Sequence, residues 1–136
     1  MDIAKLKEQL IKDEGLKLKP YKCSAGKTTI GIGRNLDDVG ITKEEAETLC
    51  FNDIMDVIKD LDIALPMWKT LSENRQLALA NMCFNLGITR LLGFKNMLNA
   101  IRAGDFKLAA QEALDSDWEK QVGNRAVRVA TMLENG

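Results

Sequence analysis

The chain has 136 residues, of which 46% are hydrophobic and 29% charged, and its formal net charge is -1. These values fit one folded domain with its own core, exclude disordered and fibrous classes, and give no general attraction to nucleic acid or an anionic membrane. The sequence has no histidine and three cysteines without zinc-site spacing, which excludes Ser-His-Asp and Cys-His catalysis, so we expect no metal, cofactor or disulfide framework.

The first predicted element is an amphipathic helix over about the first fourteen residues. Ile3, Leu6 and Leu10 recur at helical spacing, and Glu14 continues the same stripe just before Gly15. A carboxylate on this face at a helix C-terminus meets partial desolvation and the negative end of the helix dipole, which both favour its protonated form. We therefore expect Glu14 to act as an acid. The N-terminal segment has no unbroken apolar run, so we expect neither a signal peptide nor membrane insertion.

A β-hairpin is predicted next. The segment LKLKPYKC alternates like a half-buried strand, SAGK has turn chemistry, and TTIGIG alternates again. In the second strand Ile30 and Ile32 share one face, which leaves Thr29, Gly31 and Gly33 on the other. That face is nearly bare of side chains, as expected where a ligand approaches the backbone closely.

All later elements are predicted to be helices. Thr42 and Glu45 form a capping box that opens a long helix, with Pro66 as its stop. Ser72 caps a helix that ends at Gly87 and is apolar almost all round, which indicates a buried central position. Shorter helices are predicted near residues 93–103, 105–114 and 124–133.

These elements predict an α+β, mostly α fold in a single domain. A small helix-plus-hairpin lobe covers about residues 1–42. The long helix that begins near residue 43 joins it to a helical lobe, which extends to residue 136. We expect the ligand site in the cleft between the two lobes.

The blocks DEGLKLKPYKCSAGKTTIGIG, ITKEEAETL and NRAVRV resemble the bacteriophage lysozyme (endolysin) family, glycoside hydrolase family 24. The family pattern is Glu, eight residues, Asp or Cys, five residues and Thr, and Glu14, Cys23 and Thr29 match it at every spacing. The resemblance implies a lysozyme-like two-lobed fold and hydrolysis of the β-1,4 bond between N-acetylmuramic acid and N-acetylglucosamine in peptidoglycan. It also implies that Glu14 is the general acid, that Cys23 and Thr29 act around the attacking water, and that no cofactor is needed.

Cys23 needs a lowered pKa for this role. A free thiol has a pKa near 8.5 and is mostly neutral at pH 7, so we expect nearby positive charge from Lys22 or Arg34 to favour the thiolate. Activity should then rise with pH over the titration of Cys23. The alternatives for this residue, a holder of water or a transient nucleophile, stay open.

The same resemblance implies a set of residues around the substrate. Arg34 stands where family members commonly have histidine, so the partner of Glu14 becomes permanently cationic, and Arg125 is also expected near Glu14. For Phe84, Asn85 and Gln121, core packing and helix capping explain the residue types equally well. The substrate-binding set implied by the resemblance is Gly33, Arg34, Phe84, Asn85, Gln121 and Arg125.

The resemblance further implies host-cell lysis, with bacterial peptidoglycan as the substrate. We expect a monomer in the host cytoplasm that a holin-type membrane protein releases to the cell wall, with no nucleic-acid partner. Two other functions fit the sequence. A lytic transglycosylase needs Glu14 alone and expels the leaving sugar by attack of the muramoyl 6-hydroxyl, and a catalytically inactive protein would bind peptidoglycan or regulate lysis.

Overall fold

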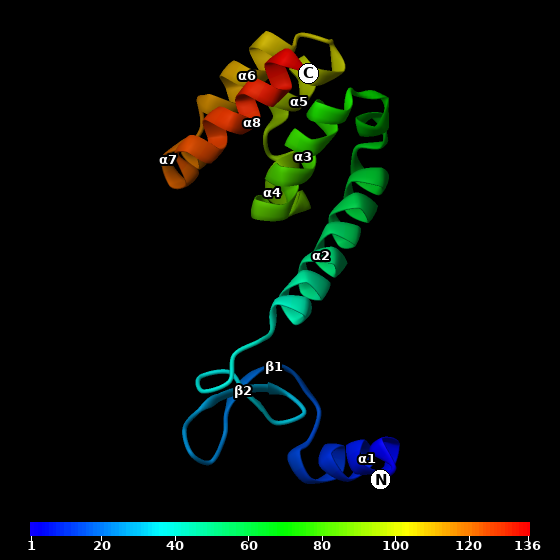
Figure 1. The fold of residues 1–136 in the computed structure, drawn as a ribbon. Helices are drawn as coiled ribbons and strands as arrows, with labels where there is room; N and C mark the ends of the chain where they lie inside the picture. Colours follow the sequence, from blue (N-terminus) through cyan, green and yellow to red (C-terminus); the bar gives the residue numbers. More distant parts are fainter. The chain divides into compact units, whose positions relative to one another are not determined.

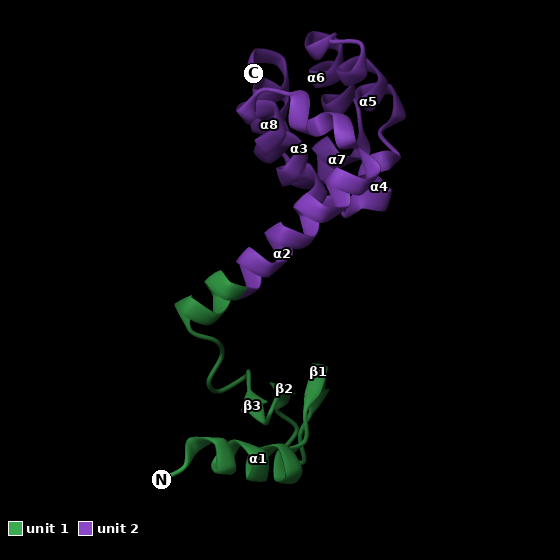
Figure 2. Ribbon diagram, turned by 90° about the vertical axis from the view of Figure 1, so that its right-hand side faces the viewer, with its two compact units in different colours: residues 1–48 green, residues 49–136 purple.

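The computed structural model describes all residues from Met1 to Gly136 and contains eight α-helices, one 3₁₀ helix and a three-stranded antiparallel sheet (Figure 1). The predicted α+β, mostly helical class is thereby confirmed. None of the helices combines the length and the apolar composition that crossing a membrane requires. The chain divides into two compact units, residues 1–48 and residues 49–136, which Figure 2 colours separately. The predicted lobe boundary and the cleft between lobes stay predictions.

The first unit begins with a helix whose two ends are both capped. The Asp2 carboxylate accepts a hydrogen bond from the Lys5 N–H at 3.2 Å, and Gly15, with φ of 80°, ends the helix directly after Glu14. Glu14 is therefore the last helical residue, as predicted. The elements of this unit are α1 (Ile3–Glu14), β1 (Lys17–Lys22), β2 (Thr28–Gly31), β3 (Arg34–Asn35) and the start of α2 (Lys43–Ala64).

The sheet has the order β1-β2-β3 with antiparallel pairing throughout. Tyr21 of β1 lies opposite Thr29 of β2, and the register shifts between Lys17 and Tyr21, where Pro20 has no N–H to donate to the ladder. The predicted second strand was too long. It ends at Gly31, and the next two residues form a turn that leads into β3, a strand that the sequence analysis did not predict.

The second unit is helical and holds the buried core. Its central helix α3 buries Ala78, Leu79, Met82, Cys83 and Leu86, which confirms the interior position predicted from its apolar sequence. The C-terminal helix α8 packs against α3 and α6. Besides most of α2, the unit comprises η1 (Pro66–Thr70), α3 (Glu73–Leu86), α4 (Ile88–Leu92), α5 (Lys95–Arg102), α6 (Phe106–Leu114), α7 (Asp117–Val122) and α8 (Asn124–Asn135).

One arginine ties the end of α8 to the rest of the core. Arg75 of α3 donates from Nε to the Leu133 carbonyl at 2.7 Å and from Nη2 to the Glu134 carbonyl at 2.8 Å. Its guanidinium also lies over the Phe106 ring, 3.5 Å from the centroid. Because the last carbonyls of a helix have no partner within the helix, these bonds satisfy groups that would otherwise need water.

Candidate active site

Glu14 packs against the turn that follows β2. A Cβ placed on Gly33 would lie 3.0 Å from both Cγ and Oε2 of Glu14, and Gly33 has φ of +72°. Both the backbone conformation and the space therefore call for glycine at this position. Glu14 is exposed, so the partial desolvation predicted for it is not seen within residues 1–48. None of the three ion pairs formed within these residues includes Glu14.

Cys23 and Thr29 meet around the backbone of Lys27. The Cys23 N–H donates to the Lys27 carbonyl at 2.9 Å, and the Cys23 carbonyl accepts from the Gly26 N–H at 2.8 Å, which closes the hairpin turn. The Thr29 hydroxyl donates to the same Lys27 carbonyl at 2.9 Å, and Thr29 is the one buried polar residue of the chain. The hairpin thus places the thiol and this hydroxyl in one local network.

Hydrogen bonds lower the pKa of the Cys23 thiol below its ordinary value. The backbone N–H of Lys27 has the largest effect, followed by that of Ala25, and the Thr29 hydroxyl adds a smaller one, while burial opposes them. The pKa of Cys23 is lowered, as predicted, but hydrogen bonds lower it rather than the predicted positive charge of Lys22 or Arg34. Lys22 donates to the Thr28 hydroxyl at 2.6 Å and does not account for the lowered pKa.

Arg34 is bound to Glu45, which corrects the expectation that it pairs with Glu14. Its Nη1 and Nη2 donate to the two carboxylate oxygens of Glu45 at 2.8 and 3.0 Å, and Nη1 also donates to the Gly40 carbonyl at 3.0 Å. Glu45 in turn accepts from the Thr42 N–H at 2.9 Å, so the predicted capping box is confirmed. The hydrogen bonds from Arg34 and then from Thr42 lower the pKa of Glu45 to about 2.

The other predicted substrate residues lie in the second unit. Asn85 accepts a hydrogen bond from the indole N–H of Trp118 at 2.8 Å, which satisfies the polar atom of a ring that is 2% exposed. Arg125 donates from Nε to the Asn81 side-chain oxygen at 2.8 Å and from Nη2 to the Asn81 carbonyl at 3.3 Å. Phe84 is 45% exposed, so its ring is available for contact.

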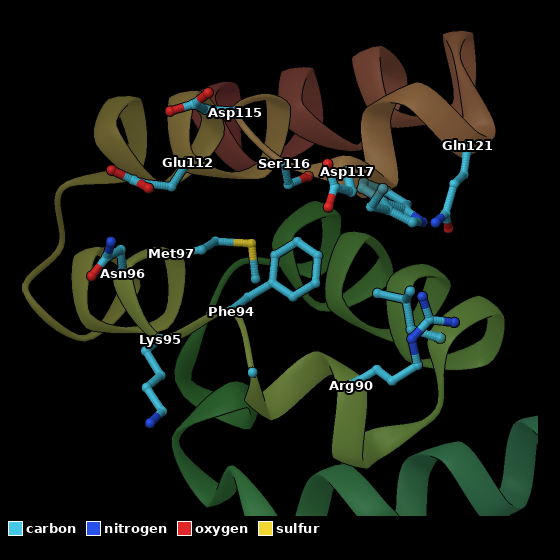
Figure 3. A pocket seen from close by; sticks show the side chains of 13 residues that line it. Arg90, Phe94, Lys95, Asn96, Met97, Glu112, Asp115, Ser116, Asp117 and Gln121 are labelled. Atoms are coloured by element: carbon cyan, nitrogen blue, oxygen red, sulfur yellow. The ribbon is translucent and has the colours of Figure 1, made fainter.

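A pocket of about 330 Å³ opens in the second unit (Figure 3). Gln121 is the one predicted substrate residue that lines it. Sequence reasoning missed the pocket, since its wall is built partly by α4 and α7, two short helices that carried no clear sequence signal. Its lining residues are Leu86, Arg90, Gly93, Phe94, Lys95, Asn96, Met97, Glu112, Asp115, Ser116, Asp117, Trp118 and Gln121.

The first unit therefore holds an exposed carboxyl, that of Glu14, and a thiol with a lowered pKa, that of Cys23, beside the buried Thr29 hydroxyl; carboxyl and other ionisable groups are what glycoside hydrolysis uses. No group of three or more Cys, Asp or Glu residues is arranged to hold a metal ion.

Known proteins match this chain along most of its length. It is 31% identical to the probable T4-type lysozyme 1 of Dictyostelium discoideum, with 98% of this chain and 96% of that protein covered. It is 34% identical to the endolysin of Acyrthosiphon pisum secondary endosymbiont phage 1, with 82% and 77% covered. It is also 34% identical to the pre-baseplate central spike protein Gp5 of Enterobacteria phage T4. That match includes 95% of this chain but only 27% of the longer spike protein.

The family described as phage lysozyme matches residues 11–133. This range includes Glu14, Cys23 and Thr29, and of α1 it includes the C-terminal end from residue 11 onward. The chain belongs to the phage lysozyme family.

Proposed function

We propose that this protein is a lysozyme that hydrolyses the β-1,4 bond between N-acetylmuramic acid and N-acetylglucosamine in peptidoglycan. Membership of the phage lysozyme family supports the glycosidase class, and relatives named T4-type lysozyme and endolysin point the same way. The observation that carries the proposal is the match of the phage lysozyme family to residues 11–133, a range that includes Glu14, Cys23 and Thr29.

In this proposal Glu14 protonates the leaving glycosidic oxygen. General acid catalysis of this kind contributes about 10²–10⁴-fold to the rate, provided that the carboxyl is protonated when substrate binds. Gly33 leaves room for this carboxyl, because a Cβ at position 33 would lie 3.0 Å from Cγ and Oε2 of Glu14.

Cys23 and Thr29 act on the water that attacks the anomeric carbon from the other face of the sugar, which inverts the configuration there. A hydroxyl has one proton, so Thr29 donates either to the Lys27 carbonyl or to the Cys23 sulfur. As the water oxygen bonds to the anomeric carbon, the thiolate accepts one proton from the water, and the Thr29 hydroxyl can then donate its hydrogen bond to the Lys27 carbonyl again. A lytic transglycosylase would not need this second group, so the lowered pKa of Cys23 favours hydrolysis.

We propose sugar-binding residues for each unit by itself. Gly33 offers backbone close to Glu14, and Phe84, Gln121 and Arg125 offer an exposed ring, an amide and a cation. Asn85 acts through the indole of Trp118. Arg34 is not assigned to the substrate, since Glu45 binds its guanidinium.

The cellular part of the proposal is lysis of a bacterial host. The protein would wait in the host cytoplasm as a monomer until a holin-type membrane protein opens the route to the wall. The endolysin relative supports this role.

Mass spectrometry of the fragments released from purified peptidoglycan tests the proposed function. The wild type should release fragments with reducing N-acetylmuramic acid ends. Glu14→Gln should lose about 10²-fold or more of this activity, whereas Glu8→Gln, which removes a second exposed carboxyl from the same helix, should retain it. Anhydro ends would identify a transglycosylase, and binding without any release by the folded wild type would identify the inactive alternative.

A further inference from the structure

We propose that Asp37 is a positioning residue for the hydrolysis, because its carboxylate holds the peptide group around which Cys23 and Thr29 are arranged. That group is the peptide between Lys27 and Thr28. The inference rests on the proposed roles of Cys23 and Thr29 at the attacking water. Asp37 comes from the segment after β3, which no step of the reaction itself uses.

The Lys27–Thr28 peptide is the centre of the local network. Its carbonyl accepts from the Cys23 N–H and from the Thr29 hydroxyl, both at 2.9 Å. The N–H of Lys27, on the preceding peptide, is the largest cause of the lowered pKa of the Cys23 thiol. The orientation of this part of the backbone therefore decides how the hydroxyl and the thiol are held.

Asp37 binds the opposite side of the same peptide. The Thr28 N–H donates to Oδ2 of Asp37 at 2.8 Å. In a planar trans peptide the N–H and the carbonyl point in opposite directions, so a partner that fixes the N–H also fixes the carbonyl. Because the carboxylate is charged, this hydrogen bond is stronger than one to a neutral acceptor, and it polarises the carbonyl toward the two groups that donate to it.

The segment that carries Asp37 is fixed by contacts of its own. The Leu36 N–H donates to the Thr28 carbonyl at 2.8 Å, so Leu36 and Asp37 together bind both polar backbone groups of Thr28. The Asp38 N–H donates to the side-chain oxygen of Asn35 at 3.0 Å, which closes the turn on the other side of Asp37. The carboxylate of Asp37 thus extends from a backbone that is already held in place.

Two simpler roles for Asp37 make different predictions. A purely structural role would make its variants less stable without changing the thiol. A purely electrostatic role would act through the negative charge, which raises the pKa of a nearby thiol. Yet the lowered pKa of Cys23 is caused by hydrogen bonds and opposed by burial, and no charged side chain contributes, although Lys22, Lys27 and Asp38 lie in this region. The contact with the peptide is the route that remains.

The first experiment titrates the Cys23 thiol in Asp37→Ala and in Asp38→Ala. Asp38 is the matched control, since it carries the same charge in the same turn, but its carboxylate contacts the side chains of Lys27 and Asn35 and not the backbone. The rate of iodoacetamide alkylation at Cys23 is measured against pH by peptide mass spectrometry. Its midpoint should rise by about half a pH unit or more in Asp37→Ala and stay at the wild-type value in Asp38→Ala. An unshifted midpoint in Asp37→Ala, or an equal shift in the control, would overturn the inference.

Asp37→Asn separates the hydrogen bond from the charge. The amide oxygen of asparagine can still accept from the Thr28 N–H, so the midpoint should stay closer to that of the wild type than to that of Asp37→Ala. A shift as large as that of Asp37→Ala would assign the effect to the charge and overturn the inference.

The second experiment measures kcat and KM against pH on soluble, uncross-linked glycan strands, by the release of reducing ends. Below the wild-type midpoint, a rise of half a unit in the pKa of Cys23 lowers the thiolate fraction about threefold, so kcat of Asp37→Ala should fall by about that factor with little change in KM. The variant has the higher pKa, so its deficit in kcat should disappear as the pH rises past both midpoints. A deficit of the same size at every pH would indicate structural damage and contradict the inference.

Two controls keep the outcome interpretable. Thermal unfolding establishes that each variant is folded. If Asp37→Ala is not, Asp37→Gly replaces it with the same expectations, because glycine lacks an acceptor and suits any turn conformation. A wild type that releases no reducing ends would refute the proposed function, and the inference with it. Normal release by the wild type together with an unshifted thiol midpoint in Asp37→Ala would refute the inference only.

Discussion

Replacing Gly33 by alanine tests whether the backbone of the turn after β2 sets the position of Glu14. The new Cβ would lie 3.0 Å from Cγ and Oε2 of Glu14, so the carboxyl must move by a few tenths of an ångström. A displacement of 1 Å in a catalytic group can cost about 10²-fold in rate, and this smaller one should lower kcat/KM by about threefold to tenfold. The backbone at φ of +72° adds strain of roughly 1–2 kcal/mol to the folded state.

Gly31→Ala is the matched control for this change. Gly31 has almost the same φ, +71°, but its Cβ would meet nothing within 4 Å. Urea unfolding should give similar losses of stability for the two variants, whereas the release of reducing ends from soluble glycan strands should fall further in Gly33→Ala. Equal losses of activity would refute the reasoning, because backbone strain alone would then explain both.

Three further predictions concern the thiol and the core. The rate of Cys23 alkylation by iodoacetamide should rise with pH, and the midpoint of this rise should lie at a lower pH than for free cysteine, because hydrogen bonds lower the pKa of Cys23. Peptide mass spectrometry measures the alkylation rate at this residue. A midpoint equal to that of free cysteine would contradict the lowered pKa. Leu79→Ala should lower the free energy of unfolding by about 2–5 kcal/mol, because Leu79 is 0% exposed. Leu77→Ala, at a position 51% exposed on the same helix, should change it by less than about 1 kcal/mol, and equal effects in urea unfolding would contradict the assigned core. Arg75→Lys should lower the free energy of unfolding by about 1–2 kcal/mol and speed amide hydrogen exchange in α8, because an ammonium group cannot make both carbonyl contacts of the planar guanidinium. Unchanged amide exchange in α8 would argue against these contacts.

The long elements of the fold could be predicted because several local signals agree at their ends. The capping box at Thr42 and Glu45 gave the start of α2, and Ser72 and Gly87 gave both ends of α3. The short elements could not be predicted in this way. Segments such as η1, α4 and α7 have five or six residues, too few for a helical repeat to stand out, and tertiary packing decides their conformation.

The candidate catalytic residues could be named from their spacing, but the interactions of their neighbours could not. Lys22 and Arg34 are close to Cys23 and Glu14 in sequence, so proximity suggested that their charges act there. The structure gives each of them another partner, Thr28 and Glu45. Sequence order does not reveal which of several polar groups within reach a long side chain selects, because that choice depends on orientation as well as distance.

Cys50 illustrates the same limit for burial. Cys50 and Cys83 both lie inside helices, α2 and α3, yet Cys83 is buried and Cys50 is exposed. Burial raises the pKa of the Cys83 thiol. The two thiols differ in burial because one lies on the core-facing side of its helix and the other on the solvent-facing side, and helix packing determines which side faces the core.

The two sides of the proposed active site differ in how strictly they constrain the residue they hold. Around Cys23 the donors are backbone N–H groups and a hydroxyl, which stabilise any small anion at that place, whether its charge lies on sulfur or oxygen. This gives a physical reason why the family pattern accepts either cysteine or aspartate there. Glu14, by contrast, lies beside Gly33, where an added Cβ would come within 3.0 Å of its Cγ and Oε2, so the contact between them limits what can stand at position 33. Variation between related proteins should therefore be tolerated at the position of Cys23 and rejected at those of Glu14 and Gly33.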